Sequence, residues 1–69
     1  MKLSARNVIE GKVTSIKKGA VAAEVQMDIG GGNTITSTVT VDSVERLGLD
    51  VGSKVSAVIK SSEVILAVD

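Results

Sequence analysis

The sequence predicts one small all-β domain that spans residues 1–69 and contains five short strands and a single brief helix. Almost all of its hydrophobic residues, which make up 43% of the chain, are Val, Ile, Ala and Leu, and none is aromatic. Apolar and polar residues alternate with a period of two in several segments, and only one stretch has the i,i+3 spacing of a helix. Together these observations predict strands that are separated by turns.

The first predicted strand runs from Asn7 to Lys18 and is rich in β-branched residues. Gly11 lies in its interior and has no side chain to pack, which predicts a bulge or a sharp coil that bends the strand. Lys17-Lys18-Gly19 then closes the strand as a hairpin turn.

The second predicted strand shows the clearest alternation in the chain. Its apolar positions are Val21, Ala23, Val25, Met27 and Ile29, and they alternate with Ala22, Glu24, Gln26 and Asp28. The turn Gly30-Gly31-Gly32-Asn33 follows, because glycine and asparagine tolerate positive φ, and it predicts a hairpin to the next strand. We reject a phosphate-binding loop here, since no Gly-Lys-Ser or Gly-Lys-Thr and no helix follows the glycines.

The third predicted strand covers Thr34 to Val41 and places four threonines on one face. The only helical spacing follows, from Asp42 to Gly48, with Gly48 at the position of a C-terminal cap. Two N-caps fit this stretch: Asp42, in a D-x-x-E pattern, or Thr40 with Ser43 in the first turn. With the second cap, the N–H groups at the helix start would be available to an anion.

Two further strands are predicted, from Lys54 to Lys60 and from Glu63 to Val68. The last is apolar on both faces, which is unusual for an antiparallel strand at the surface of a monomer, so we expect it to meet another subunit. Five strands with a helix between the third and fourth is the element order of the OB-fold, a small Greek-key barrel.

Composition narrows the classes of function. Eight basic and eight acidic residues give a net charge of zero, so no global field attracts nucleic acid or an anionic membrane, and no aromatic side chain is present to stack on bases. The absence of His and Cys and of clustered carboxylates leaves no metal-ligand cluster and no evident catalytic group, so we expect a protein that is not an enzyme. We find no signal peptide and no apolar run long enough to span a bilayer, and we expect a cytoplasmic protein.

The small size of the chain predicts that it is stabilised by oligomerisation. A chain of 69 residues without disulfide, zinc site or aromatic core has little to offset the entropy of folding. Its aliphatic content is larger than such a domain readily hides in its own interior, so oligomerisation is the remaining reinforcement.

A candidate anion site begins at Ser4-Ala5-Arg6-Asn7. In an extended segment Ser4 and Arg6 project to the same face. The guanidinium fork and the hydroxyl together match an oxyanion, although a solvated charge near a frayed terminus is the alternative for these four residues alone.

Several motifs resemble those of the molbindins, the stand-alone Mop-domain proteins that bind molybdate. The likeness covers essentially the whole chain and depends on the order and spacing of Ser4-Ala5-Arg6-Asn7, Thr40-x-x-Ser43, Leu47-Gly48-Leu49, Gly52-x-x-Val55 and Ala57-Val58-Ile59-Lys60-Ser61-Ser62. The resemblance implies binding of molybdate, with tungstate as a possible substitute, for intracellular molybdenum storage or homeostasis. It also implies a hexamer, a trimer of dimers, with the oxyanions in subunit interfaces.

The resemblance also implies which residues bind the ligand. It places Ser4 and Arg6 of one subunit, with Thr40, Ser43, Lys60 and Ser61 of a neighbour, around the oxyanion. A second oxyanion site, built largely from backbone N–H groups, is expected near Lys18, Gly19, Val21 and Ala22. The alternative function is an OB-fold module that binds nucleic acid or protein without an oxyanion ligand.

Overall fold

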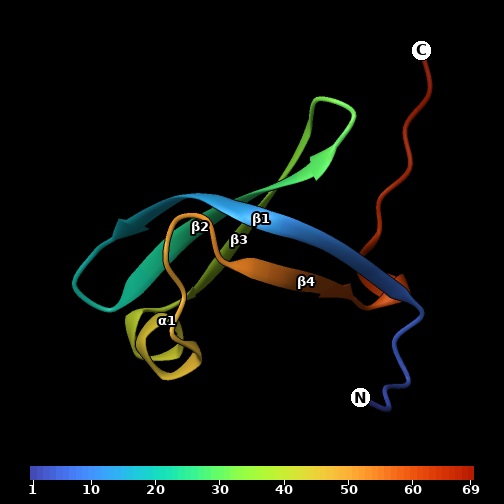
Figure 1. The fold of residues 1–69 in the computed structure, drawn as a ribbon. Coiled ribbons are helices and arrows are strands. Elements are labelled where there is room, and N and C mark those ends of the chain that lie inside the picture. The colour runs from blue at the N-terminus through green and yellow to red at the C-terminus, as the bar shows by residue number, and fades with distance from the viewer.

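A four-stranded antiparallel sheet and one short helix make up the fold of residues 1–69, which are described by a computed structural model (Figure 1). The elements are β1 (Asn7–Lys18), β2 (Ala22–Gly30), β3 (Asn33–Thr40), α1 (Val41–Leu47), β4 (Lys54–Ile59) and a 3₁₀ turn, η1 (Ser61–Glu63). The strand order β3-β2-β1-β4 is that of a Greek key, in which the fourth strand returns to lie beside the first. The all-β class and the helix between the third and fourth strands are therefore confirmed.

The fifth predicted strand, Glu63 to Val68, is wrong for this chain. Two backbone hydrogen bonds form η1 after β4, from Glu63 N–H to the Lys60 carbonyl at 2.8 Å and from Val64 N–H to the Ser61 carbonyl at 3.3 Å. The chain then leaves the sheet and runs away from it as an unpaired segment (Figure 1). The sequence shows only that residues 63–68 have a high propensity for β-structure. A strand forms only if the segment also lies beside the edge of another strand and pairs with it.

Glycine has two separate roles in the sheet. Gly31 and Gly32 have φ of 65° and 78°, as a two-residue β2–β3 hairpin requires, and this turn is confirmed. The predicted bulge at Gly11 lies instead between Val13 and Ser15, where the β1–β2 register shifts. Gly11 permits close approach, because a Cβ there would lie 2.8 Å from Met27 Cε and would collide with the Asp28 carbonyl.

The helix begins at the second of the two predicted caps. Thr40 Oγ1 accepts a 3.0 Å hydrogen bond from Ser43 N–H, so Thr40 is the N-cap and Asp42 lies in the first turn. Val41 N–H donates to the Val21 carbonyl at 2.8 Å, which continues the β2–β3 pairing up to the helix. Gly48 ends the helix with φ of 64°, as predicted.

The core is small. Only five of the 69 residues are buried, namely Val13, Ala23, Val25, Met27 and Val44. Large hydrophobic side chains remain exposed along β1, α1, β4 and the C-terminal segment. A single chain therefore leaves much of its aliphatic surface in water, as expected from composition.

Candidate functional site

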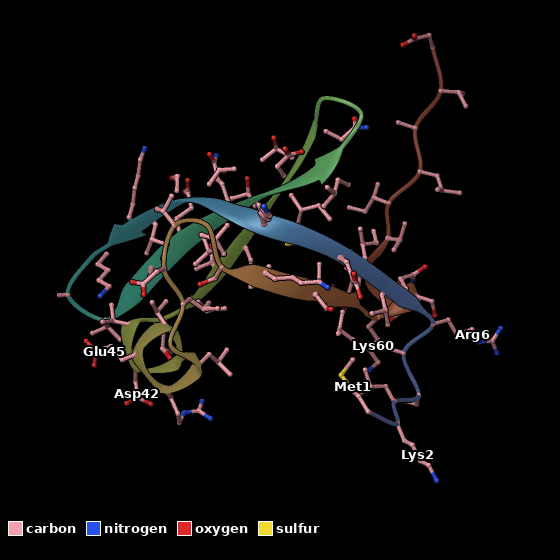
Figure 2. The ribbon with its side chains drawn as sticks, in the orientation of Figure 1. Met1, Lys2, Arg6, Asp42, Glu45 and Lys60 are labelled. Carbon is pink, nitrogen blue, oxygen red and sulfur yellow. The ribbon has the colours of Figure 1, made fainter.

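The two candidate cations, Arg6 and Lys60, lie at the same end of the sheet. Antiparallel pairing of β1 with β4 sets Asn7 opposite Ile59, and a 3.1 Å hydrogen bond from Asn7 Nδ2 to the Ile59 carbonyl fastens this end. Arg6 and Lys60 are the next residues outward on each strand. Figure 2 shows both at this end, together with Lys2 and Met1.

Neither cation is neutralised within the chain. The protein has two ion pairs, Asp42–Arg46 at 3.6 Å and Glu10–Lys54 at 3.7 Å, and neither involves Arg6 or Lys60. Ser4 lies in the bend before β1, Ser61 follows Lys60 at the start of η1, and all four side chains are exposed. We call Ser4, Arg6, Lys60 and Ser61 the cationic end. It offers positive charge and hydroxyl donors that no other group of the chain uses.

Thr40 and Ser43 form a separate, ordered pair at the start of α1, which we call the hydroxyl cap. Thr40 Oγ1 donates to Ser43 Oγ at 2.8 Å and accepts from Ser43 N–H at 3.0 Å. Ser43 Oγ also accepts from Arg46 Nη2 at 3.3 Å. Since Ser43 Oγ accepts two hydrogen bonds, its own proton is left to donate to a ligand.

Arg46 was missed by sequence reasoning. Its guanidinium reaches Ser43 from one helical turn further on, and it also pairs with Asp42. The signal was present, because residues at i and i+3 on a helix are neighbours. Arg46 brings a positive charge to the hydroxyl cap, which otherwise has none.

The helix start offers fewer backbone donors than expected. Val41 N–H is bound to the Val21 carbonyl and Ser43 N–H to Thr40 Oγ1. Side-chain hydroxyls rather than these two amides are therefore the donors available at this end of the molecule.

The cationic end and the hydroxyl cap are far apart in one chain. Thr40 pairs with Ala22, beside the Lys18 end of β1, whereas Arg6 precedes the opposite end of this 12-residue strand. At about 3.3 Å per residue, a straight strand of that length spans roughly 35 Å. Figure 2 accordingly shows Arg6 and Asp42 on opposite sides of the molecule. No small ion touches both groups of a single chain.

This grouping differs from the division that the resemblance implies. Within one chain, Lys60 and Ser61 lie with Ser4 and Arg6 rather than with Thr40 and Ser43. Each chain thus presents two separate groups of candidate residues, one at each end of its sheet.

The second expected site lies at the β1–β2 turn, next to the hydroxyl cap. Gly19 N–H already donates to the Ala22 carbonyl at 2.8 Å, and the Val21 carbonyl accepts from Val41. Lys18 is exposed at the end of β1. A shallow depression beside the turn is lined by Ala20, Val21, Thr40, Val41, Asp42 and Glu45. Its two carboxylates disfavour an anion within this depression in the single chain.

No group of three or more His, Cys, Asp or Glu side chains is placed to hold a metal ion. Among the helices, none has the length and apolar character needed to cross a membrane.

Comparison with known proteins gives a consistent result. Residues 3–66 match the TOBE domain family. Molybdenum-pterin-binding protein 1 of Clostridium pasteurianum is 52% identical over 66 residues, which cover 96% of this chain and 97% of that protein. The relative is named for what it binds rather than for a reaction.

Two solved structures share the fold. MopII from Clostridium pasteurianum superposes with a TM-score of 0.90 at 49% identity, covering 97% of this chain and 100% of that one. The cytoplasmic molybdate-binding protein ModG, with molybdate bound, gives a TM-score of 0.95 at 52% identity over 100% of this chain and 49% of that one. The family match, the near-complete coverage and the shared fold together show that this chain belongs to the TOBE domain family and, within it, to the molbindins.

Proposed function

We propose that this protein binds molybdate, and tungstate in its place, between copies of the chain in an oligomer, and that it stores or buffers molybdenum in the cytoplasm. Support comes from its relatives, one of which is described as a cytoplasmic protein with molybdate bound. The observation that carries the proposal is the division of the chain into two half-sites, an unpaired cationic end and a remote hydroxyl cap.

The two half-sites complement each other. A dianion requires positive charge, which Arg6 and Lys60 supply, and it requires oriented donors, which the Ser43 hydroxyl and its neighbours supply. In the proposed assembly the cationic end of one chain faces the hydroxyl cap of another. Closing the interface removes water from the charges and strengthens their attraction to the anion.

The surface around the cationic end is suited to an interface. Val8 and Val58 lie opposite each other next to Arg6 and Lys60, and each is 44% exposed on the outer face of the sheet. In the proposed assembly another subunit covers this exposed apolar pair together with the cations. We propose a hexamer, as the resemblance implies, with binding rather than catalysis as its activity.

Two measurements test the proposal. Native mass spectrometry with and without molybdate reports the number of subunits and of bound ligands together. A monomer that binds molybdate with full affinity would contradict an interface site.

Isothermal titration compares Arg6→Ala with Lys17→Ala, a matched removal of a positive charge at the other end of β1. A charge-assisted hydrogen bond typically contributes about 1.5–3 kcal/mol, so Arg6→Ala weakens molybdate binding by about 10- to 150-fold. Lys17→Ala leaves it nearly unchanged. Equal losses in the two variants would place the site elsewhere.

A further inference from the structure

Arg46 contacts two groups at the hydroxyl cap with one guanidinium. Its Nη2 donates to Ser43 Oγ at 3.3 Å, and its Nε lies 3.6 Å from Asp42 Oδ2. The side chains of Arg46 and Asp42 are 68% and 86% exposed, and an ion pair between exposed side chains stabilises a helix only slightly. Arg46 therefore contributes little to folding, and its effect falls mainly on the two groups that it contacts.

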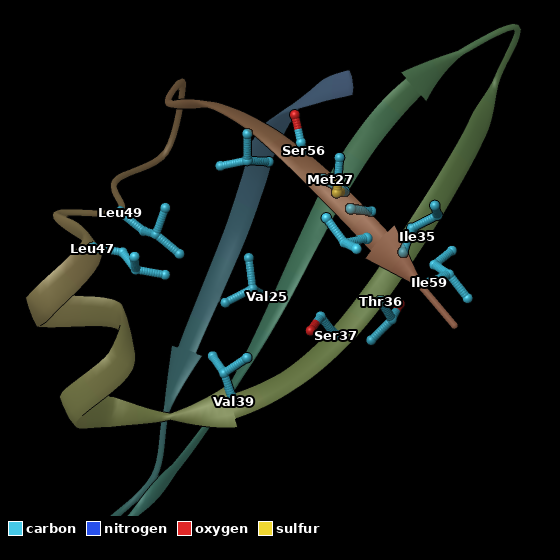
Figure 3. A pocket seen from close by; sticks show the side chains of 13 residues that line it. Val25, Met27, Ile35, Thr36, Ser37, Val39, Leu47, Leu49, Ser56 and Ile59 are labelled. Atoms are coloured by element: carbon cyan, nitrogen blue, oxygen red, sulfur yellow. The ribbon is translucent and has the colours of Figure 1, made fainter. Parts of the chain in front are cut away.

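The helix that carries Arg46 is held in place by its apolar residues. Val44 is buried in the core, and Leu47 lines an apolar groove of about 420 Å³ between β3 and β4 (Figure 3). Ser43 and Arg46 lie one helical turn apart, so the backbone sets the separation between their side chains. The contact between them is thus part of a fixed element.

The two hydrogen bonds that Ser43 Oγ accepts decide what this oxygen can offer a ligand. A serine hydroxyl has one proton to donate and two lone pairs with which to accept. Thr40 Oγ1 donates to one lone pair at 2.8 Å, and Arg46 Nη2 donates to the other. Toward any further group, Ser43 Oγ is therefore a donor only.

Removing the guanidinium would change this property. Ser43 Oγ would regain a free lone pair, and the Asp42 carboxylate would lose its ion-pair partner. Both changes add a hydrogen-bond acceptor at the cap, and an acceptor favours a ligand that carries a proton. Arg46 thus keeps the cap suited to ligands whose oxygens only accept.

We propose that Arg46 is a positioning residue, which directs the Ser43 proton toward the ligand and so selects oxyanions that carry no proton. The inference rests on the proposed function, because it concerns the ligand of the same site. Molybdate, tungstate and sulfate present only acceptor oxygens near neutral pH, whereas hydrogen phosphate also carries an O–H group. In a closed interface this O–H group would face the Ser43 O–H and find no acceptor there. Selection by protonation is separate from selection by size.

Competition by sulfate and by phosphate isolates the effect of the proton. The two anions are nearly equal in size, and at mildly alkaline pH they carry the same charge. Each is titrated against bound molybdate at constant ionic strength, and we expect the wild-type protein to prefer sulfate. Arg46→Met keeps the aliphatic stem but neither contact, and should narrow this preference about fivefold or more.

The conservative substitution should rescue the selectivity. Arg46→Lys keeps a positive charge and N–H donors, so we expect it to restore most of the preference for sulfate. A wild-type protein without this preference, or a preference that Arg46→Met leaves unchanged, would overturn the proposal.

Asp42→Asn is the control for the ion pair. It removes the pair and leaves Arg46 on Ser43, so the wild-type preference should persist. The double variant Asp42→Asn, Arg46→Met should lose the preference, because no carboxylate is freed and the contact with Ser43 is still absent. A double variant that keeps the preference would assign it to Asp42 and contradict the role of Ser43.

A double-mutant cycle tests whether Arg46 acts through Ser43. In a Ser43→Ala background, Arg46→Met should change the ratio of sulfate to phosphate affinity by less than about twofold. The loss of charge cancels in this ratio, because both anions carry the same charge. Additive effects of the two substitutions would show that Arg46 acts independently of Ser43, against the proposal.

Titration of the wild-type protein with molybdate separates this inference from the proposed function. If the protein binds molybdate but Arg46→Met leaves the preference unchanged, the inference fails and the proposed function stands. If the protein does not bind molybdate, both fail. Methionine and lysine are good helix formers, and circular dichroism and sedimentation verify that each variant is folded and assembled like the wild type.

Discussion

The candidate ligand-binding side chains at the two ends of the sheet differ in how they are held. At the hydroxyl cap, Thr40 and Ser43 are held by the helix that they help to start, and their hydrogen bonds to each other and to Arg46 fix the oxygens in place. At the cationic end, Arg6 and Lys60 are exposed and make no ion pair. One end offers hydroxyl groups that are held by hydrogen bonds, and the other offers positive charges that no group of the same chain pairs with.

This difference predicts that the two ends contribute differently to the proposed oxyanion site, one to its selectivity and the other to its affinity. Fixed donors discriminate between ligands by size, because they cannot follow a smaller ion without distorting the fold. Exposed cations without a fixed partner supply attraction that depends mainly on the charge of the ion. Selectivity is therefore expected from the hydroxyl cap, and affinity mainly from the cationic end.

The largest effect is expected from removing both cations. The double variant Arg6→Ala, Lys60→Ala should weaken molybdate binding by about 100-fold or more, since each charge-assisted contact contributes about 1.5–3 kcal/mol. The melting temperature without ligand should change little, because neither side chain has a partner in the chain. Titration calorimetry and thermal unfolding measure the two quantities. A large loss of stability without ligand would show that these cations have a structural role instead.

Competition between anions separates charge from size. Molybdate and sulfate carry the same charge, so the cationic end cannot distinguish them, and the smaller sulfate should leave fixed donors unpaired at a cost of roughly 1–3 kcal/mol each when buried. Molybdate and tungstate should bind within about tenfold of each other, whereas sulfate should compete only in large excess. Competition titrations at constant ionic strength measure this. Displacement of molybdate by sulfate at comparable concentration would remove size selection from the proposal.

A smaller effect, of a different kind, is expected at the hydroxyl cap. Thr40→Ala removes an N-cap, which typically costs about 0.5–2 kcal/mol, and should lower the melting temperature by several degrees. It should also weaken molybdate binding, because the Ser43 hydroxyl loses its fixed neighbour. Thr40→Ser keeps the cap oxygen and is the matched control. Weaker binding with unchanged melting temperature would show that Thr40 acts on the ligand alone.

Local structure was largely predictable from this sequence. The Gly31-Gly32 hairpin, the helix after Thr40 and its end at Gly48 each depend on residues within a few positions of one another. Such signals are local backbone preferences, so no tertiary information is needed to interpret them. The candidate residues Ser4 and Arg6 were found in the same way, from their spacing along an extended segment.

Positions that depend on a neighbouring strand were not predictable. Gly11 was expected to form a bulge or a sharp coil, yet the register shift falls between Val13 and Ser15. Gly11 instead permits the close approach of Met27 and Asp28 from the neighbouring strand. Arg46 is a different case, because its contact with Ser43 spans one helical turn and is predictable from the i,i+3 spacing alone.

The sequence by itself determined the all-β class, the β2–β3 turn and the helix, since these follow from local backbone preferences. Side-chain chemistry supplied the candidate residues of the proposed anion site. Only the tertiary structure decided that Arg6 and Lys60 lie together, far from Thr40, and that Val64–Val68 leaves the sheet. Strand pairing made the first decision, because register fixes which distant residues become neighbours. The second follows from η1, whose hydrogen bonds turn the chain away from the edge with which it would have paired.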